Sequence, residues 1–445
     1  MSKITSKKIQ FPALKNHKIT FDFSGDHISS DAGGLLLRES DRKLNLLAPI
    51  AKLFSDNRDS SKIIHSIETM LRQRVFGIAL GYDDLNDHNT LRNDVAFQTI
   101  VSSNNELASS PTLCRFENTA NREIAVGINK LMIENFIASF KEAPEELILD
   151  FDATENPIYG EQEGKYYNGF YRSNCFLPLH IYCGKQILIS YLRTSKKDGA
   201  HHSWAILSLL VKRFRQVWPN VKIIFRADCG FYRHKTLSWC ERNNVDYIVG
   251  AVGNPRLLTL LKPQINRVKR NFEETKIKQR EFARFMYAAE TWTTERYVIG
   301  KAEHNENGSN QRFVVTTLNW EAPGALSDDS QELYDSIYCA RGDMENRIKD
   351  SKLDVASGRT SCHDWWPNQL RVLLSALAYI LIDYIRRCCL TETELASAQM
   401  GTIRLKLFKI GAVITKTAKR THFQLSRYFP LQIVFIRAFE ILFSG

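Results

Sequence analysis

A chain of 445 residues is too long for one compact core, so we expect two to four domains. Its 60 Lys and Arg outnumber 49 Asp and Glu, and the net charge of +11 favours an anionic partner such as nucleic acid. No apolar run reaches the ~20 residues of a membrane span, and the N-terminus has no signal-peptide core, so we expect a cytoplasmic protein without a membrane partner. The nine cysteines show no zinc spacing and fit reduced thiols.

Residues 1–145 are predicted to form a mainly helical DNA-binding region. Residues 33–54 and 62–81 show apolar side chains at helical spacing. Ser110 and Pro111 give the start signal of a further helix. The helical segment that follows presents Arg115 and Arg122, a residue type that contacts DNA phosphates and base edges. A solvated helix face is the alternative interpretation of these arginines.

Residues 146–250 change to strand patterns. Apolar runs at 146–154, 166–183, 185–193, 221–231 and 246–252 predict strands, and helices are expected near 202–218 and 235–243. Three strands, a helix, a strand, a helix and a strand is the order of a ribonuclease H-like core. We therefore predict an α/β fold with residues 146–250 as the first part of that core.

The rest of the chain is predicted to complete the core and to add two further parts. Residues 251–333 mix charged segments with strand-like pieces and are interpreted as a β-rich insertion. Residues 334–390 return to the core with a helix that carries an acidic residue. Residues 391–445 are predicted to be a basic helical tail, because residues 401–437 hold eight Lys and Arg and no acidic residue.

Three carboxylates stand at positions where they could meet. Asp152 ends the first core strand, Asp228 ends the fourth, and Glu345 lies on the late helix. Asp150 shares a strand face with Asp152, so periodicity leaves both open, although Asp152 is nearer the carboxyl end of the strand. We interpret Asp152, Asp228 and Glu345 as a catalytic set.

One face of the late helix combines a phenol, two cations and a carboxylate. Tyr338, Arg341, Glu345 and Lys352 fall within roughly 60° of one another at ~100° per residue. The cations can grip phosphate oxygens, and the carboxylate can hold a divalent cation. A solvated face with ordinary ion pairs is the alternative for an arbitrary helix.

The carboxylate set predicts a two-metal site. Three carboxylates can hold two divalent cations, one activating the attacking water or 3′ hydroxyl and the other stabilising the leaving oxygen. Oxygen ligands favour Mg²⁺, with Mn²⁺ as a substitute. His201, His202 and His234 raise a zinc alternative, but they lack a matching ligand spacing.

Three motifs carry a family resemblance. LDFDATENPIYG, FRADCGF and YCARGDMENRIKDSK resemble the three acidic motifs of DDE transposases of bacterial insertion sequences. The third matches the Tyr-Arg-Glu-Lys signature of one superfamily at Tyr338, Arg341, Glu345 and Lys352. Other segments, such as GGLLLRESDRKL and LKLFKIGAVITKTAKR, are similar to the IS-thirteen-eighty-like family within it. The resemblance extends over nearly the whole chain.

The resemblance implies cut-and-paste transposition on double-stranded DNA. The protein would bind the terminal inverted repeats of an insertion sequence, associated with the bacterial nucleoid, and act as a homodimer with Mg²⁺ on those ends and on target DNA. Asp152, Asp228 and Glu345 would hold the metals, while Tyr338, Arg341 and Lys352 would contact the DNA backbone. Trp292 and Trp320 are candidates for stacking on a flipped base, with a place in the core of the insertion as their alternative.

Two other functions remain open. A transposase-derived protein could bind DNA without cutting it, and it would give salt-sensitive binding with no metal-dependent product. A glycoside hydrolase could use two carboxylates as acid and base, although the positive charge and the Arg-Glu-Lys face oppose that interpretation.

Overall fold

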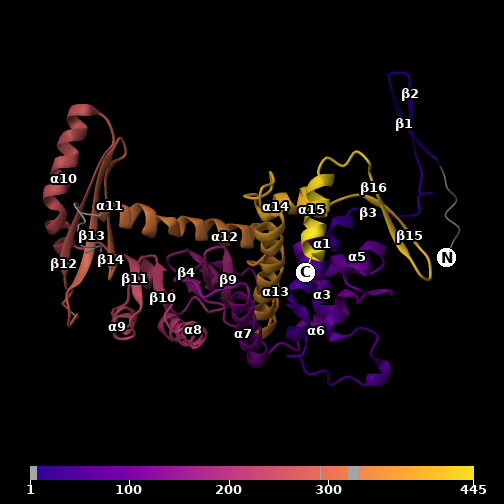
Figure 1. The fold of residues 1–445 in the computed structure, drawn as a ribbon, viewed down its shortest axis with the longest axis horizontal. Coiled ribbons are helices and arrows are strands. Elements are labelled where there is room, and N and C mark those ends of the chain that lie inside the picture. Colours follow the sequence, from indigo (N-terminus) through magenta and orange to yellow (C-terminus); the bar gives the residue numbers. More distant parts are fainter. Residues whose placement is uncertain (1–7, 291, 319–329, 445) are drawn as a thin grey trace. The chain divides into compact units, whose positions relative to one another are not determined.

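The computed structural model describes residues 8–290, 292–318 and 330–444 (Figure 1). It contains two compact units: unit 1 comprises residues 1–116 and 381–445, and unit 2 comprises residues 117–380. Both ends of the chain thus contribute to unit 1, which differs from the predicted divisions at residues 145 and 391. No helix in the described ranges has both the length and the apolar content to cross a membrane.

Unit 1 is mainly helical, as its sequence pattern predicts. Ser66 and Asp94 begin two of its helices, and their side chains accept hydrogen bonds from the backbone N–H groups of Thr69 and Phe97. The helices are α1 (Leu35–Leu44), α2 (Leu47–Ala51), α3 (Ile67–Ala79), α4 (His88–Leu91), α5 (Val95–Ile100), α6 (Ser110–Glu117), α14 (Met400–Ile403) and α15 (Gln432–Phe443).

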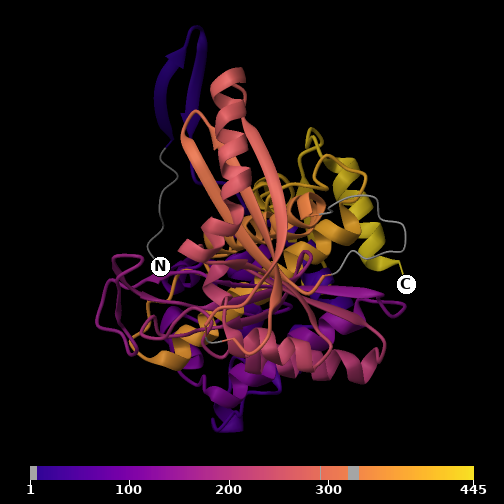
Figure 2. The ribbon, with the colours of Figure 1, turned by 90° about the vertical axis from the view of Figure 1, so that its left-hand side faces the viewer.

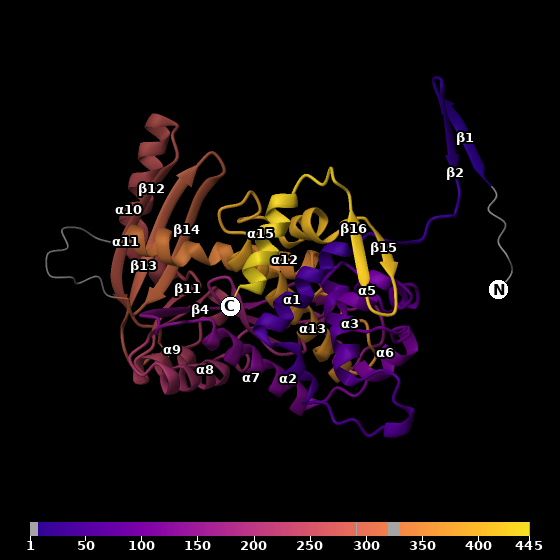
Figure 3. The same ribbon diagram turned by 45° about the vertical axis from the view of Figure 1, so that its right-hand side comes forward.

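Unit 1 also contains two small sheets. The hairpin of β1 (Ile9–Leu14) and β2 (His17–Phe21) is one of them. The other has the order β16 (Thr421–Leu425), β15 (Ala412–Lys416) and β3 (His27–Ser29) (Figure 1). Figure 3 shows β15 and β16 side by side. The tail is therefore not purely helical as predicted, because β-branched side chains at 413–415 favour a strand that pairs with β3.

Unit 2 is built on a mixed sheet of eight strands with the order β12-β13-β14-β11-β10-β4-β8-β9. The three central strands β4, β10 and β11 are parallel, and the others are antiparallel to their neighbours. The strands of this sheet are β4 (Glu146–Ala153), β8 (Leu179–Cys183), β9 (Gln186–Tyr191), β10 (Lys222–Ala227), β11 (Asp246–Ala251), β12 (Gln279–Tyr287), β13 (Arg296–Asn305) and β14 (Gly308–Thr316). The predicted α/β class is confirmed, while the ribonuclease H-like assignment stays a prediction.

Helices and a side sheet complete unit 2. The helices are α7 (Arg122–Ala138), α8 (Ser203–Val217), α9 (His234–Arg242), α10 (Pro255–Thr275), α11 (Ser330–Glu332), α12 (Gly342–Leu353) and α13 (Trp365–Tyr384), the last of which continues into residues of unit 1. The short strands β5 (Asn156–Pro157), β7 (Ser173–Phe176) and β6 (Tyr167–Asn168) form a separate small sheet. The core packs tightly: the ring of Phe151 lies 4.9 Å from that of Phe225 and 6.2 Å from that of Phe231.

The region predicted as a β-rich insertion extends the main sheet. β14 pairs with β11, with Val315 opposite Val249, so β12 to β14 continue the sheet that holds β4 and β10. The region also begins with a helix that was not predicted, α10, which Asn254 caps and Pro255 starts. Figure 2 shows α10 running alongside these strands.

Candidate active site

Asp152 and Asp228 occupy neighbouring positions at one edge of the central sheet. β4 and β10 run parallel with Phe151 opposite Ala227, and the residue that follows each of these two in the chain is an aspartate. The carboxyl ends of parallel strands are where α/β sheets bind ligands. The register of two apolar strands therefore brings two carboxylates together.

Asp150, on the same face of β4, is paired with an arginine. Both of its carboxylate oxygens accept hydrogen bonds from Arg226, at 2.5 and 2.7 Å, and both side chains are at least nine-tenths buried. Arg226 lies directly opposite Asp150 on β10 and also donates to the carbonyl of Ile337. Asp150 is thus paired inside the sheet, which favours Asp152 over Asp150 as the predicted catalytic residue of this pair.

The electrostatics of Asp152 link all three predicted acids. Burial and then the negative charge of Asp228 raise the pKa of Asp152 to about 7, and Glu345 adds a smaller upward effect. The positive charge of Arg341 opposes these effects. Such influence requires proximity, because Coulomb energy falls with distance and with solvent screening. The charges of Asp228 and Glu345 thus both disfavour ionisation of Asp152.

The late helix is present but irregular at its start. Residues Leu333–Tyr338 form a π-helical segment, and a tight turn, Cys339–Arg341, leads into α12. Arg341 forms an ion pair with Glu345 at 2.5 Å. Lys352 Nζ donates to the carbonyl oxygen of Glu155 at 2.6 Å, and burial lowers the pKa of this lysine. Both cations therefore lie close to the acidic residues.

Tyr338 reaches the same place because Gly250 on β11 has no side chain. A Cβ at Gly250 would lie 2.6 Å from the Tyr338 hydroxyl and 2.9 Å from the backbone nitrogen of Cys229. Burial raises the pKa of Tyr338, so the phenol keeps its proton at neutral pH. Tyr338, Asp228 and Arg341 share the wall of a pocket of about 490 Å³, whose other lining includes Phe313, Tyr334, Gln311 and Arg312.

The carboxylates do not form a closed metal site as they stand. Among the described residues, no three His, Cys, Asp or Glu side chains group closely enough to hold a metal ion. Glu345 is instead paired with Arg341. The described residues also form no zinc site at the predicted histidines. His234 stacks on Trp292 and contacts Arg296 instead.

Three of the remaining predicted DNA contacts fall on described residues. Arg115 is exposed on α6, and Arg122 is exposed at the start of α7. Trp292 is half-buried against the core of unit 2, packed between Tyr232 and Tyr287. Trp320 lies outside the described residues. DNA binding by these four residues stays a prediction.

Three residues at the site were missed by the sequence interpretation. Arg226 has a signal, because a cation two residues before Asp228 on a buried strand needs a charged partner. Gly250 also has one, since a glycine inside a strand often marks a close approach. Tyr171 has none: its pKa is raised to about 12 by burial and by the charges of Asp152, Glu155 and Asp228, and only the fold brings it there.

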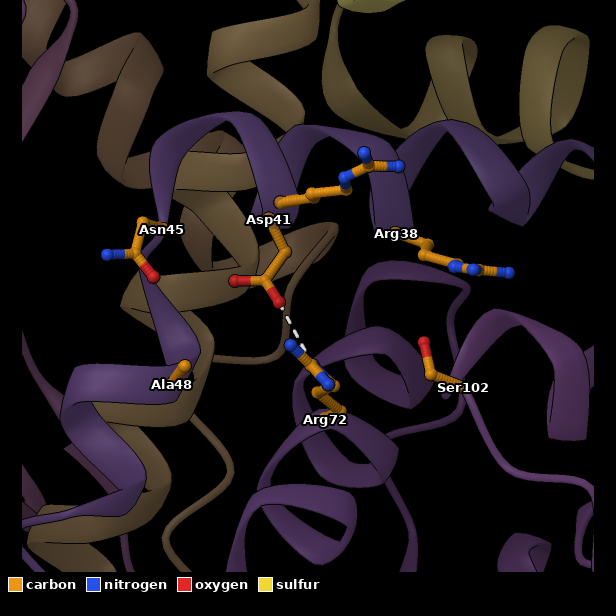
Figure 4. A pocket seen from close by; sticks show the side chains of 7 residues that line it. Arg38, Asp41, Asn45, Ala48, Arg72 and Ser102 are labelled. Atoms are coloured by element: carbon orange, nitrogen blue, oxygen red, sulfur yellow. Dashed lines mark hydrogen bonds and ion pairs between the residues drawn. The ribbon is translucent and has the colours of Figure 1, made fainter.

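A second pocket lies wholly within unit 1. It has a volume of about 390 Å³ and is lined by Arg38, Asp41, Arg42, Asn45, Ala48, Arg72 and Ser102 (Figure 4). Asp41 lies inside and accepts a hydrogen bond from Arg72 at 3.1 Å, whereas the side chain of Arg42 is 73% exposed. Arg38 donates to the carbonyl oxygen of Thr99 at the end of α5. The pocket thus presents guanidinium groups to solvent.

Comparison with known proteins identifies the family. The model of the family described as "Transposase DDE domain group 1" matches residues 11–444. A solved structure with a similar chain is the piggyBac transposase synaptic complex with hairpin DNA, at 12% identity and a TM-score of 0.41, with 85% of this chain and 80% of that chain covered. No curated protein matches the sequence. Since the family match spans almost the entire chain, the protein belongs to the DDE transposases, group 1.

Proposed function

We propose that this transposase binds the terminal inverted repeats of a bacterial insertion sequence of the IS-thirteen-eighty-like family and cuts and rejoins DNA there as a homodimer. Asp152, Asp228 and Glu345 are the proposed catalytic acids. The observation that supports this most is the register of β4 and β10, which sets Asp152 beside Asp228, together with the influence of Glu345 on the same carboxyl group.

DDE transposases generally use divalent metal ions. The donor set fits such an ion, because Asp152, Asp228 and Glu345 offer oxygen ligands only, as Mg²⁺ and Mn²⁺ prefer. Burial and then repulsion by Asp228 raise the pKa of Asp152, and a bound cation would stabilise the ionised carboxylate against both effects. When bound, a pair of Mg²⁺ ions would supply charge stabilisation for the attacking and leaving oxygens. Glu345 would have to leave Arg341 to join them.

The cations of α12 are proposed to position the DNA. Arg341 can exchange its ion pair with Glu345 for a phosphate, a charge-assisted contact of the same kind. Lys352, held at the carbonyl of Glu155, can bind a second phosphate oxygen beside β4. Tyr338 keeps its proton and can donate a hydrogen bond to the backbone. Release of Glu345 by Arg341 would couple DNA binding to completion of the acidic set.

Unit 1 is proposed to bind the DNA backbone as well. Its pocket presents Arg38 and Arg42 from successive turns of α1, a spacing that suits contact with a phosphate. Glu39 lies within 3.6 Å of both guanidinium groups, so their charge is partly balanced before DNA binds. A phosphate would therefore compete with two long contacts to Glu39, whose side chain is only 14% exposed.

Strand cleavage tests the proposal. The full chain is incubated with Mg²⁺ and duplex DNA that carries the inverted repeats flanking its coding region, and nicked products are resolved on denaturing gels. Wild type is expected to cut at the repeat end, and Asp152→Asn, Asp228→Asn and Glu345→Gln are each expected to lose at least about a hundredfold in rate. Binding without any cleavage would instead favour a transposase-derived DNA-binding protein.

Asp343→Asn provides the matched control. This residue is an exposed carboxylate on the first turn of α12, two positions before Glu345. Its substitution removes the same charge from the same helix, so cleavage is expected to continue at close to the wild-type rate. If Asp343→Asn were as inactive as Glu345→Gln, the effect would be one of helix charge and the assignment of Glu345 would be wrong.

A further inference from the structure

A segment of unit 2 displays an unusual number of aromatic side chains to solvent. Residues 159–172, here called the aromatic lobe, include Tyr159, Tyr166, Tyr167 and Phe170. Their exposed fractions are 96%, 45%, 57% and 86%. Four large aromatic side chains exposed within one short segment are candidates for a binding surface, because a folded chain otherwise buries much of such groups.

The backbone of the aromatic lobe is held by hydrogen bonds within the lobe and from Thr194 and Ser195. The side chain of Asn168 accepts from the backbone N–H groups of Phe170 and Tyr171. Ser195 Oγ donates to the carbonyl of Tyr166, and Thr194 Oγ1 donates to that of Gly164, both at 2.9 Å. These contacts fix the backbone of the lobe at Gly164, Tyr166, Phe170 and Tyr171.

Gly164 gives the aromatic lobe a second point of attachment. Its φ of +84° is a conformation that glycine adopts without strain, and a Cβ there would lie 2.7 Å from the ring of Trp365. The ring of Trp365 in turn packs edge-on against Phe176, 5.5 Å away. The lobe is thus packed on α13 at one point while its aromatic side chains face solvent.

The aromatic lobe begins close to the proposed catalytic acids. The segment follows Asp152 by seven residues, and the backbone N–H of Thr154 donates to the carbonyl of Pro178 just before it. Tyr171, within the lobe, lies in the electrostatic field of Asp152 and Asp228. The ring of Phe170 lies 4.9 Å from that of Tyr171, so a base stacked on Phe170 would lie beside a residue that is exposed to the charges of these aspartates.

The chemistry of the aromatic lobe fits unpaired bases better than duplex DNA. Its charges nearly balance, with Glu161 and Glu163 against Lys165 and Arg172, so charge alone would not hold a polyanion. Lys196 lies 5.9 Å from the ring of Tyr166 and adds a cation beside the aromatic surface. Aromatic faces stack on any base that is free of its partner strand.

We propose that the aromatic lobe binds the unpaired nucleotides of a DNA strand that leaves the catalytic acids. Tyr159 and Phe170, the most exposed rings, are the stacking residues, and Tyr166 with Lys196 supports the strand beside them. This inference rests on the proposed function, since it supplies a place for the strand that cleavage separates. The ligand is single-stranded DNA, recognised through base faces rather than sequence.

Fluorescence anisotropy of the full chain tests the inference. The probes are a labelled oligo-dT of about 20 nucleotides and a labelled duplex of similar length. Wild type is expected to bind both. The double variant Tyr159→Ala with Phe170→Ala is expected to bind oligo-dT about 5- to 150-fold more weakly for each stacked ring removed, with duplex binding unchanged.

Tyr428→Ala is the matched control. Tyr428 is another highly exposed tyrosine, 75% accessible, beside Arg427 in unit 1. Its substitution is expected to leave oligo-dT binding unchanged. Circular dichroism and thermal unfolding must show that all variants fold. Tyr159→Phe, which keeps the ring, is expected to bind oligo-dT as wild type does.

Four outcomes overturn the inference. The first two are unchanged oligo-dT binding in the double variant and an equal loss of its duplex and oligo-dT affinity. The third is an equal loss of oligo-dT affinity in Tyr428→Ala. The fourth is a change of the double variant from dimer to monomer, which would make the lobe a protein interface. Failure of the proposed function has another signature. In that case wild type would not cut repeat DNA with Mg²⁺, whereas failure of this inference alone would leave wild-type cleavage intact.

Discussion

Two aspartates on one face of β4 have different electrostatic environments in this protein. Asp150 is neutralised by Arg226, and Asp152, two residues later, faces the carboxylate of Asp228. Strand alternation treats both positions alike, so the sequence could narrow the choice only by the position along β4. The decisive fact is the register that sets Arg226 opposite Asp150.

Substitution of Asp150 is predicted to damage stability. Asp150→Asn leaves a buried guanidinium without its anion, which typically costs about 3–5 kcal/mol of unfolding free energy. Urea unfolding followed by circular dichroism measures this loss. Asp152→Asn is expected to be far less destabilising, since burial and then the negative charge of Asp228 already disfavour its ionised carboxylate. A stable but inactive Asp150→Asn protein would mean that Asp150, rather than Asp152, is the catalytic residue of β4.

His88 is predicted to make unit 1 sensitive to acid. It is fully buried with Nε2 3.0 Å from Arg74, and burial followed by the charge of Arg74 lowers its pKa to about 3. Below pH 6.5 the unfolded chain takes up a proton that the folded chain refuses, so stability falls as pH decreases from about 6.5 towards 3. Urea midpoints measured across this range should fall less steeply for His88→Gln, and an equal slope would contradict the prediction.

At the scale of elements, the close approach of β11 and the π-helical segment shapes the site. Gly250→Ala is predicted to push Tyr338 away, because the added Cβ would lie 2.6 Å from its hydroxyl and 2.9 Å from the backbone of Cys229. We expect DNA cleavage to fall by about tenfold or more while DNA binding persists. Gly253→Ala is the control, since its Cβ would meet only Phe313 among the described residues, at 3.3 Å. Equal rates for both variants would show that Tyr338 is not positioned by Gly250.

The arginines of α1 are predicted to contribute to DNA affinity through charge. Arg38→Gln with Arg42→Gln should lower the dependence of log K on log salt concentration by about one unit for each phosphate that is no longer neutralised. Duplex DNA binding measured at several salt concentrations gives this slope. Arg213→Gln serves as control, because Arg213 is a surface arginine of unit 2 paired with Glu134. An unchanged slope in the double variant would remove unit 1 from the proposed DNA-binding surface.

Local patterns predicted the elements better than their pairing. The apolar runs of β4, β10 and β11 and the caps of α3 and α5 are local signals, and the strands and helices form where these occur. The pairing of Val249 with Val315 joins segments 66 residues apart, and no local pattern encodes it. The π-helical turn before α12 was likewise invisible, because Tyr338, Arg341 and Glu345 keep helical spacing through it. Asp152 and Asp228 were singled out because strand ends are legible in sequence, and Glu345 because of the helix face that it shares with Tyr338 and Arg341. The role of the three as catalytic acids stays a prediction.

For the whole molecule, the division into units follows the pairing of distant segments. β3 from the N-terminal part pairs with β15 from the C-terminal part, with Ser29 opposite Ala412. Asp31 forms an ion pair with Lys409 at 2.7 Å, and the N–H of Ala32 donates to the carbonyl of Ile410. The two ends of the chain therefore fold as one unit, and the three proposed catalytic acids all belong to the other.

Titration of Mn²⁺ tests most directly whether Asp152, Asp228 and Glu345 share one metal site. Isothermal calorimetry of the full chain with duplex DNA should detect binding that each of Asp152→Asn, Asp228→Asn and Glu345→Gln weakens by at least about tenfold. Asp343→Asn should bind as wild type does. Wild-type affinity in any one of the three variants would contradict a site shared by these carboxylates.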